Sequence, residues 1–462
     1  MNIIESIQHV VFGVWAVVLL GLVGYVTTGT VRFAVAPVAA KRHYPLMLWT
    51  RLRWHWLARN LNLCQVDKHG PSKSRAAFGP TIGKNVRIEK SKAKIRFPRV
   101  RWRADQYGII ARVRLIPGVG RKEFEAATAY LADYWKCSRV QVSSPRPGIL
   151  VVRGLRRDPL ADGLTLADIR RHDVALALFL GRDEWATDRW LPLSGIAGIT
   201  VGGLPGYGKT SLILSWLMEL FPLAFVQIVV IDGKGGGDYI GLKSRLMRLV
   251  DDDLFAALVV FRELRQELRH RQATVVSRLG VTNGWKAGPR EDFSLLVVIV
   301  DECHTFFDLD GVKGDKTKYD LDGLPTKDGI TKTEAVLEIR SIAADLVKKG
   351  RSVMMLSLWL TQKQTSDAIP TAIRDNCTVG LSFAVKTVDA AVAALGDAIR
   401  QYGAYCPTTL REQPTYIGVC TASISGDGDP FVRVRVPRVD ESAADDLAEQ
   451  TAHYRRDFAQ AA

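Results

Sequence analysis

Residues 203–210 have the residue types and the spacing of a loop that binds phosphate. The segment reads Gly-Leu-Pro-Gly-Tyr-Gly-Lys-Thr, which fits the pattern G-x-x-x-x-G-K-[ST]. Glycines let the backbone curl so that its N–H groups point at phosphate oxygens, and Lys209 adds a positive charge. The Thr210 hydroxyl can bind Mg²⁺. The pattern predicts an ATP site formed by Gly203, Leu204, Pro205, Gly206, Tyr207, Gly208, Lys209, Thr210 and Ser211.

A pair of acidic residues about ninety positions further on completes the expected site. The apolar run Leu295–Val300 ends in Asp301 and Glu302. Such a run is typical of a central strand that is buried on both faces of a parallel sheet, and ligands bind at the carboxyl end of such strands. We expect Asp301 to hold Mg²⁺ and Glu302 to polarise the water that attacks the γ-phosphate.

The elements around these residues alternate between strand and helix signals, which predicts an α/β fold with a parallel sheet. The loop follows the apolar run Ile196–Val201 and precedes a helical stretch at Ser211–Leu220. Further on, Gln227–Ile231 and Val353–Leu360 have strand patterns, and Leu254–Leu279 has the pattern of a long amphipathic helix. We expect the polar stretch 308–332 to be a mobile surface loop.

Residues 107–175 are expected to form a small α/β module before the nucleotide-binding domain at 176–438. Gly108–Leu115 is typical of a strand, Glu123–Lys136 of a helix, and 140–152 of a hairpin. The last segment, 439–462, is predicted to hold one charged helix, Asp440–Phe458.

The N-terminal segment 1–40 has the features of a membrane anchor. No charged residue occurs between Glu5 and Arg32, and Val10–Val26 is almost wholly apolar. A cleaved signal peptide would begin with basic residues, and this segment does not. Lys and Arg follow it, which predicts a single crossing in the cell membrane with the ATPase domain in the cytoplasm. A second crossing at 33–40 would require a tight hairpin.

The segment 41–106 holds most of the net charge of +15. Residues 41–110 contain 17 Lys and Arg and 3 acids, a net +14. Basic and aromatic residues alternate at 49–56 and 96–102, which suits either DNA or anionic lipid. We favour lipid for 41–60, whereas both partners stay open for 84–103. The six cysteines are scattered without a C-x-x-C pair, so they predict neither a zinc site nor a disulfide framework.

The ordered motifs resemble the FtsK/SpoIIIE family of membrane-anchored DNA translocases, in particular the Tra transfer proteins of actinobacterial conjugative elements. Besides the phosphate loop and V-V-I-V-D-E at 297–302, the chain has D-G-K-G-G at 232–236, with Gly233 in place of the family's Pro. It also has L-T-Q-K-Q at 360–364, whose last two residues depart from the family, and I-P-T-A-I-R-D-N at 369–376.

The resemblance implies a RecA-like P-loop NTPase motor that assembles as a hexameric ring around double-stranded DNA. It implies that Gln362 senses the γ-phosphate and that an arginine reaches a neighbour's nucleotide. Arg374 is the favoured candidate, with Arg340 and Arg351 as alternatives. His304, beside the acidic pair, is interpreted as a packed residue rather than a catalyst.

The chain departs from this family after Val436, where too few residues remain for the winged-helix module that reads DNA sequence in many members. The basic segment or other transfer proteins would then load the DNA. Two further functions stay open at this point. One is transport of single-stranded DNA by a coupling protein, and the other is a ring ATPase that drives protein secretion.

Overall fold

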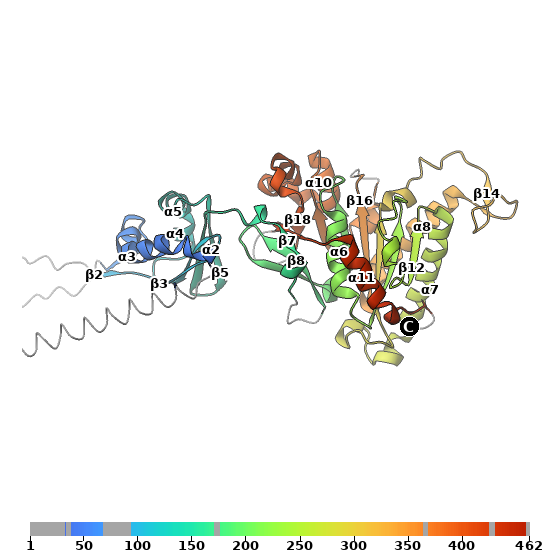
Figure 1. Cartoon of the computed structure of the whole chain (residues 1–462), viewed down its shortest axis with the longest axis horizontal. Helices are drawn as coiled ribbons and strands as arrows, with labels where there is room; N and C mark the ends of the chain where they lie inside the picture. The colour runs from blue at the N-terminus through green and yellow to red at the C-terminus, as the bar shows by residue number, and fades with distance from the viewer. Residues whose placement is uncertain are drawn as a thin grey trace, which may run out of the picture. The chain divides into compact units, whose positions relative to one another are not determined.

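The computed structural model describes residues 33, 38–67, 94–170, 176–363, 368–424 and 430–458. The chain divides into a small unit, which ends at Asp158, and a large unit, which begins at Pro159. Figure 1 labels their elements. Among the described residues, no helix is both long enough and apolar enough to span a bilayer. The predicted membrane anchor lies outside the described residues, apart from its last few positions.

The small unit is a four-stranded antiparallel sheet with helices packed on one face. The sheet order is β3-β4-β6-β5, and one hydrophobic core joins its inner face to Trp54 of α3, Phe124 of α4 and Leu131 of α5. The elements of this unit are α2 (Val38–Lys41), α3 (Tyr44–Asn60), β1 (Gln65–Asp67), β2 (Lys94–Arg96), β3 (Arg99–Ala104), β4 (Gly108–Arg114), α4 (Arg121–Ala126), α5 (Thr128–Trp135), β5 (Arg139–Arg146) and β6 (Ile149–Leu155).

The structure draws the boundaries of the small module differently from the sequence prediction. The expected division at 106/107 separates β3 from β4, yet these strands pair along their whole length, from Arg99 opposite Arg114 to Ala104 opposite Ile109. α3 contributes to the same core, so much of the basic segment belongs to the folded module. The single helix predicted at Glu123–Lys136 is two helices that meet at Ala127.

The large unit is built on a ten-stranded sheet of order β12-β11-β13-β16-β10-β17-β18-β19-β8-β9. The first six strands are parallel, as predicted, whereas the last four pair antiparallel. The strands of this sheet are β8 (Ala177–Asp183), β9 (Asp188–Pro192), β10 (Gly198–Gly202), β11 (Val226–Asp232), β12 (Arg248–Asp251), β13 (Leu295–Asp301), β16 (Met355–Thr361), β17 (Val379–Ser382), β18 (Val419–Ser423) and β19 (Val432–Arg435).

Two short strand pairs lie outside this sheet. β7 (Leu164–Thr165) pairs with β20 (Pro437–Arg438), so residues 159–170 belong to the large unit. The sequence prediction placed them in the small module. β14 (Lys318–Tyr319) and β15 (Ile330–Thr331) form a hairpin inside the polar stretch 308–332.

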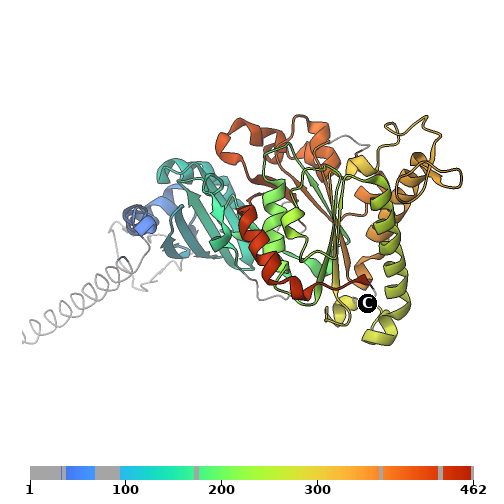
Figure 2. The same cartoon turned by 45° about the vertical axis from the view of Figure 1, so that its right-hand side comes forward.

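Helices cover both faces of the large sheet. α6 and α11 lie on one face, and α7 and α8 lie together on the other (Figure 2). The helices of the large unit are α6 (Lys209–Leu220), α7 (Leu254–Leu279), α8 (Lys332–Lys349), α9 (Thr371–Arg374), α10 (Val388–Leu395) and α11 (Glu441–Gln450).

The ends of these helices have local causes. α7 has the predicted bounds because the Asp253 side chain accepts hydrogen bonds from two N–H groups of its first turn and Gly280 terminates it at φ 69°. The C-terminal helix is shorter than predicted and ends at Gln450. Buried Gln227 of β11 bonds the backbone of Tyr454 and Arg456, which holds the following segment against the sheet.

Candidate nucleotide site

The phosphate loop lies where the sequence predicts it, between β10 and the first residue of α6. Gly203 and Gly208 have φ angles of 152° and 108°, which favour glycine. A Cβ atom on Gly203 would come within 2.6 Å of the Cβ of Phe383. Two backbone hydrogen bonds, from Leu204 to Ala384 and from Gly418 to Tyr207, fix the loop to its neighbours. The loop therefore has a set shape at the N-terminus of a helix, where anions bind.

Lys209 is buried within this loop. Its Nζ donates to the carbonyl of Gly203 at 2.7 Å and to that of Leu204 at 3.3 Å. Burial lowers the pKa of Lys209, and the nearby charges of Glu302 and Asp301 oppose that shift. Because carbonyl oxygens are weak partners for an ammonium group, phosphate oxygens can replace them.

Asp301 ends β13 at the carboxyl edge of the sheet. Its Oδ2 accepts a hydrogen bond from the buried Tyr239 hydroxyl at 2.7 Å, and its Oδ1 accepts one from the Glu302 N–H at 2.9 Å. Burial raises the pKa of Asp301, while the Tyr239 hydrogen bond lowers it. Tyr239 is a functional candidate that the sequence pattern did not identify, because 62 positions separate it from Asp301.

Glu302 differs from Asp301 both in its backbone conformation and in the contacts of its side chain. Its φ is 45°, an uncommon left-handed value for a residue other than glycine. Its Oε2 accepts a hydrogen bond from the Gln362 N–H at 3.0 Å and lies 3.3 Å from His304 Nδ1. Burial acts to raise the pKa of Glu302, but the hydrogen bonds from His304 and Gln362 outweigh it and lower the pKa. The other oxygen, Oε1, is buried and has no hydrogen-bond partner among the residues that the structure describes.

The neighbouring strand explains the Gly233 departure from the family motif. The Gly233 N–H donates to the Asp301 carbonyl at 2.9 Å, a bond that a proline cannot make. A Cβ there would also lie 2.7 Å from the Glu302 carbonyl. The preceding residue, Asp232, is paired in register with Asp301, and burial raises its pKa to about 6.

These groups meet in one cavity of about 870 Å³. Its wall includes the phosphate loop, Lys234, the acidic pair and Gln362. A further part of the wall comes from residues 163–165, 417–418 and 435–438. Arg435 supports that wall, since its Nε donates to the Leu160 carbonyl at 2.8 Å and its other nitrogens contact the carbonyls of Thr415 and Ile417. The sequence pattern did not single out this wall, because no motif marks it.

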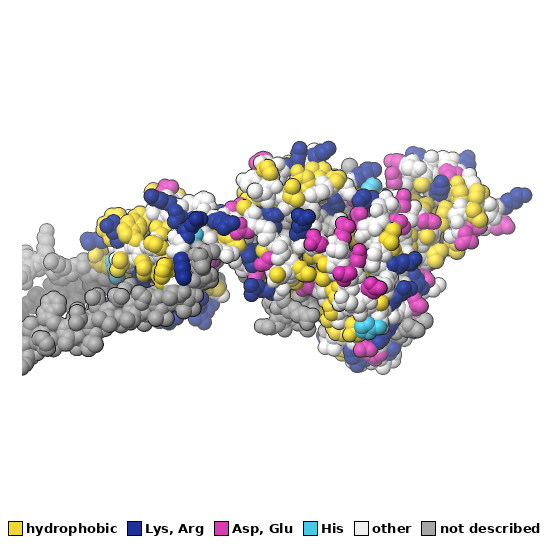
Figure 3. Space-filling view, in the orientation of Figure 1, with side chains coloured by type: hydrophobic (Ala, Val, Ile, Leu, Met, Phe, Trp, Pro, Cys, Tyr) yellow, Lys and Arg dark blue, Asp and Glu magenta, His cyan; other side chains and the backbone are white. Residues whose placement is uncertain are grey.

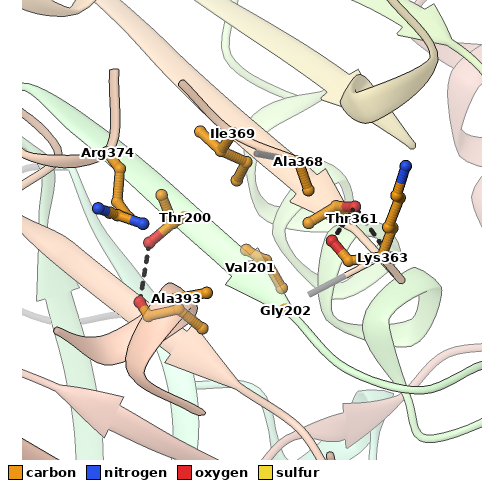
Figure 4. Close-up of a pocket in the computed structure, with 10 residues that line it drawn as sticks. Thr200, Val201, Gly202, Thr361, Lys363, Ala368, Ile369, Arg374 and Ala393 are labelled. Atoms are coloured by element: carbon orange, nitrogen blue, oxygen red, sulfur yellow. Dashed lines mark hydrogen bonds between the residues drawn. The ribbon is translucent and has the colours of Figure 1, made fainter. Parts of the chain in front are cut away.

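None of the three arginine candidates is among the residues that line this cavity. Arg374 lines a separate small cavity and points toward Thr200 of β10 (Figure 4). Arg340 donates to the Phe307 carbonyl of its own chain at 2.9 Å, and Arg351 is exposed. The role of an arginine from a neighbouring chain therefore stays a prediction.

The sheet, the loop at its carboxyl edge and the acidic pair define the class of this protein as a P-loop ATPase. No family model matches the sequence, and no curated protein matches it significantly. Among solved structures, the pCW3 conjugation coupling protein TcpA, in monomer form with ATPγS, is similar with a TM-score of 0.50 at 14% identity. That match covers 77% of this chain and 94% of TcpA. This likeness confirms the predicted P-loop NTPase fold.

Two type VII secretion ATPases give weaker matches. The cytoplasmic domain of EccC from Thermomonospora curvata has a TM-score of 0.45 at 15% identity, over 65% of this chain and 34% of EccC. ATPases 2 and 3 of EssC from Geobacillus thermodenitrificans have a TM-score of 0.42 at 13% identity, over 63% of this chain and 51% of EssC.

Proposed function

We propose that this protein is an FtsK/SpoIIIE-type motor that hydrolyses ATP to move double-stranded DNA, in conjugal transfer or chromosome partition. The convergence of the phosphate loop, Asp301, Glu302 and Gln362 on one cavity carries the ATPase part of the proposal. The DNA part is supported by the ordered family motifs and by the strongly basic small unit.

The residues present suit ATP and Mg²⁺. The loop N–H groups and Lys209 would hold the phosphates, and Thr210 and Asp301 would hold Mg²⁺, which when bound neutralises charge on the phosphates. Glu302 keeps a carboxylate at neutral pH because its pKa is lowered. Its Oε2 already accepts a hydrogen bond from Gln362, whereas Oε1 has no partner in the described residues and would accept a proton from the attacking water.

Gln362 would connect the nucleotide to the rest of the unit. Its N–H bonds Glu302, and it follows β16 directly. A change in the γ-phosphate that moves Glu302 would therefore also move Gln362 at the end of β16. In a hexameric ring, Arg374 would leave Thr200 and reach the nucleotide of the adjacent copy.

The ATPase rate of the full chain with and without linear duplex DNA tests this function. We expect duplex DNA to raise the rate severalfold more than single-stranded DNA, with Lys209→Ala as the blank. Stronger stimulation by single strands would favour a single-strand coupling protein. No stimulation by either nucleic acid would contradict a DNA cargo and favour a protein cargo.

A membrane location is part of the same proposal. The apolar run at 10–26 would anchor the chain, and the α3 surface would lie on anionic lipid. Trp49, Leu52 and Trp56 of α3 are exposed, and the Arg53 guanidinium lies 4.9 Å from the ring centre of Trp49. Replacing residues 1–37 with a soluble tag should release the protein from membranes. Continued sedimentation with membranes would place the anchor on α3 instead.

A further inference from the structure

One face of the small unit's sheet is formed largely by arginine side chains. Arg99, Arg101 and Arg103 alternate along β3, and Arg112 and Arg114 alternate along β4. All five are exposed. The strand register places Arg99 opposite Arg114 and Arg101 opposite Arg112, so the five side chains share one face. The intervening residues, such as Val113 and Ala111, point to the helix-covered core instead.

This arrangement has no structural explanation within the small unit. Like charges directly opposite each other on a sheet destabilise it. None of the five forms an ion pair in the described part of the chain, whereas the neighbouring Arg153 pairs with Asp105 at 2.5 Å. Residues 68–93, outside the described residues, carry seven Lys and Arg and one Glu, so they add positive charge rather than neutralise it.

The charge contrast extends over the surface of the small unit. Residues 94–158 contain 15 Lys and Arg and 5 Asp and Glu. Figure 3 shows many dark-blue and few magenta side chains over this unit, whereas both colours are intermixed over the large unit. A negatively charged partner would offset the repulsion between the arginines that lie opposite each other on β3 and β4.

We propose that this arginine face, Arg99, Arg101, Arg103, Arg112 and Arg114, binds the phosphate backbone of duplex DNA. Guanidinium groups bind phosphate oxygens with two parallel hydrogen bonds. Neighbouring arginines stand about 5 Å apart across the strands and about 7 Å apart along them, so several of them can contact one stretch of a phosphate backbone at the same time. Contacts of this kind position DNA without reading its sequence.

The chemistry of the face favours DNA over a bilayer. Binding to a bilayer surface uses large aromatic and aliphatic side chains that enter the headgroup region. On the arginine face the apolar residues are Ile110, Ile149 and Val151, which are only partly exposed. The exposed Trp49 and Trp56 lie on α3, in the helical layer that covers the opposite face of the sheet.

This inference rests on the proposed function in one respect, the choice of duplex DNA as the polyanion. It adds a binding surface outside the ATPase unit that does not depend on nucleotide. Such a surface would hold duplex DNA without sequence preference.

The test is the binding of a fluorescent duplex to the full chain in detergent without nucleotide, measured by anisotropy across a range of NaCl concentrations. The variant is Arg101→Gln/Arg112→Gln, which removes one directly opposed pair. We expect about tenfold weaker binding near 0.1 M salt and a loss of about two from the slope of log K against log salt. Arg101→Lys/Arg112→Lys keeps the charges and should restore most of the slope.

A matched control removes the same charge from the helical layer of the same unit. Arg51→Gln/Arg59→Gln changes two exposed arginines of α3. The slope of log K against log salt should then differ from the wild-type slope by less than about 0.5. Equal weakening by both pairs, or none by the sheet pair, would overturn the proposal. If the sheet variant loses binding to anionic lipid vesicles while it binds duplex DNA like wild type, the partner of the arginine face is lipid and the proposal is wrong.

Failure of this inference can be told apart from failure of the proposed function. If the sheet variant binds DNA like wild type and duplex still stimulates ATPase, only the arginine face is wrong. If the wild-type chain neither binds duplex nor responds to it, the proposed function fails as well.

Discussion

The arginines of the two units have opposite environments. In the large unit, buried Arg271 bonds Glu267 at 2.5 Å and the Ser294 carbonyl at 2.6 Å, and buried Arg245 bonds three backbone carbonyls. Partly exposed Arg262 pairs with Glu338 at 2.7 Å. In the small unit, the side chains of the arginine face are exposed and have no carboxylate partner within the described part of the chain. The buried arginines of the large unit therefore stabilise its fold, whereas the five arginines of the arginine face are placed to bind a partner.

The largest effect on stability should come from removing a buried arginine of the large unit. Arg271→Leu leaves the Glu267 carboxylate buried without its partner, which should lower the free energy of unfolding by about 3–5 kcal/mol. Denaturant unfolding followed by circular dichroism measures it. Glu267→Leu/Arg271→Leu should recover part of the loss, because no charge then stays buried. If Arg271→Leu alone lowers the free energy of unfolding by less than about 1 kcal/mol, the difference proposed between the arginines of the two units is wrong.

The charges of the nucleotide site should matter for turnover rather than for folding. Glu302→Gln removes the group that accepts the proton from water and should lower the ATPase rate at least about 100-fold, or about 2.7 kcal/mol in the barrier. ATP binding should persist, because Lys209 and the loop are unchanged. A wild-type turnover rate in this variant would remove Glu302 from the assigned role.

A smaller effect is expected at the hydroxyl that holds Asp301. Tyr239→Phe removes the hydrogen bond that lowers the Asp301 pKa, so the carboxylate should be harder to form and to orient. The Mg²⁺ concentration for half-maximal ATPase activity should rise about tenfold. Tyr319→Phe, which removes a hydroxyl bonded to Asp315 in the β14–β15 hairpin, is the matched control and should leave this concentration unchanged.

Asp232 should make stability depend on pH. Its pKa is raised from 3.8 to about 6, so its charged form destabilises the fold, with no cost below about pH 3.8 and the full cost above about pH 6. Asp232→Asn should therefore raise Tm by a few degrees at pH 7.5 and leave it unchanged near pH 4, in the absence of nucleotide and Mg²⁺. A constant Tm difference across this range would contradict the raised pKa.

The smallest effect on stability should come from the arginine face itself. Arg101→Gln/Arg112→Gln removes a like-charged pair and should change the free energy of unfolding by less than about 1 kcal/mol, toward greater stability. The same denaturant measurement as for Arg271 gives a direct comparison. A clear destabilisation would mean that these arginines support the fold and would remove the difference between the two units.

The sequence alone was sufficient for elements with strong local signals. The apolar runs that became β11, β13 and β16 predicted buried strands, and the phosphate loop predicted the strand, the turn and the helix around it. The bounds of α7 followed from its amphipathic pattern, and the structure adds Asp253 and Gly280 as the residues that cap its ends. These features depend on residues close together in the chain, so periodicity and capping identify them.

The sequence alone was insufficient where residues distant in the chain meet. Only the packed structure joins β3 to β4, bonds the segment after the C-terminal helix to Gln227, and adds four antiparallel strands to the sheet. It alone brings the Tyr239 hydroxyl to Asp301, the Gln362 N–H to Glu302, and Arg435 to the wall of the cavity. The physical reason is that local patterns report which face of an element is buried, whereas the choice of partner depends on how the buried faces pack together.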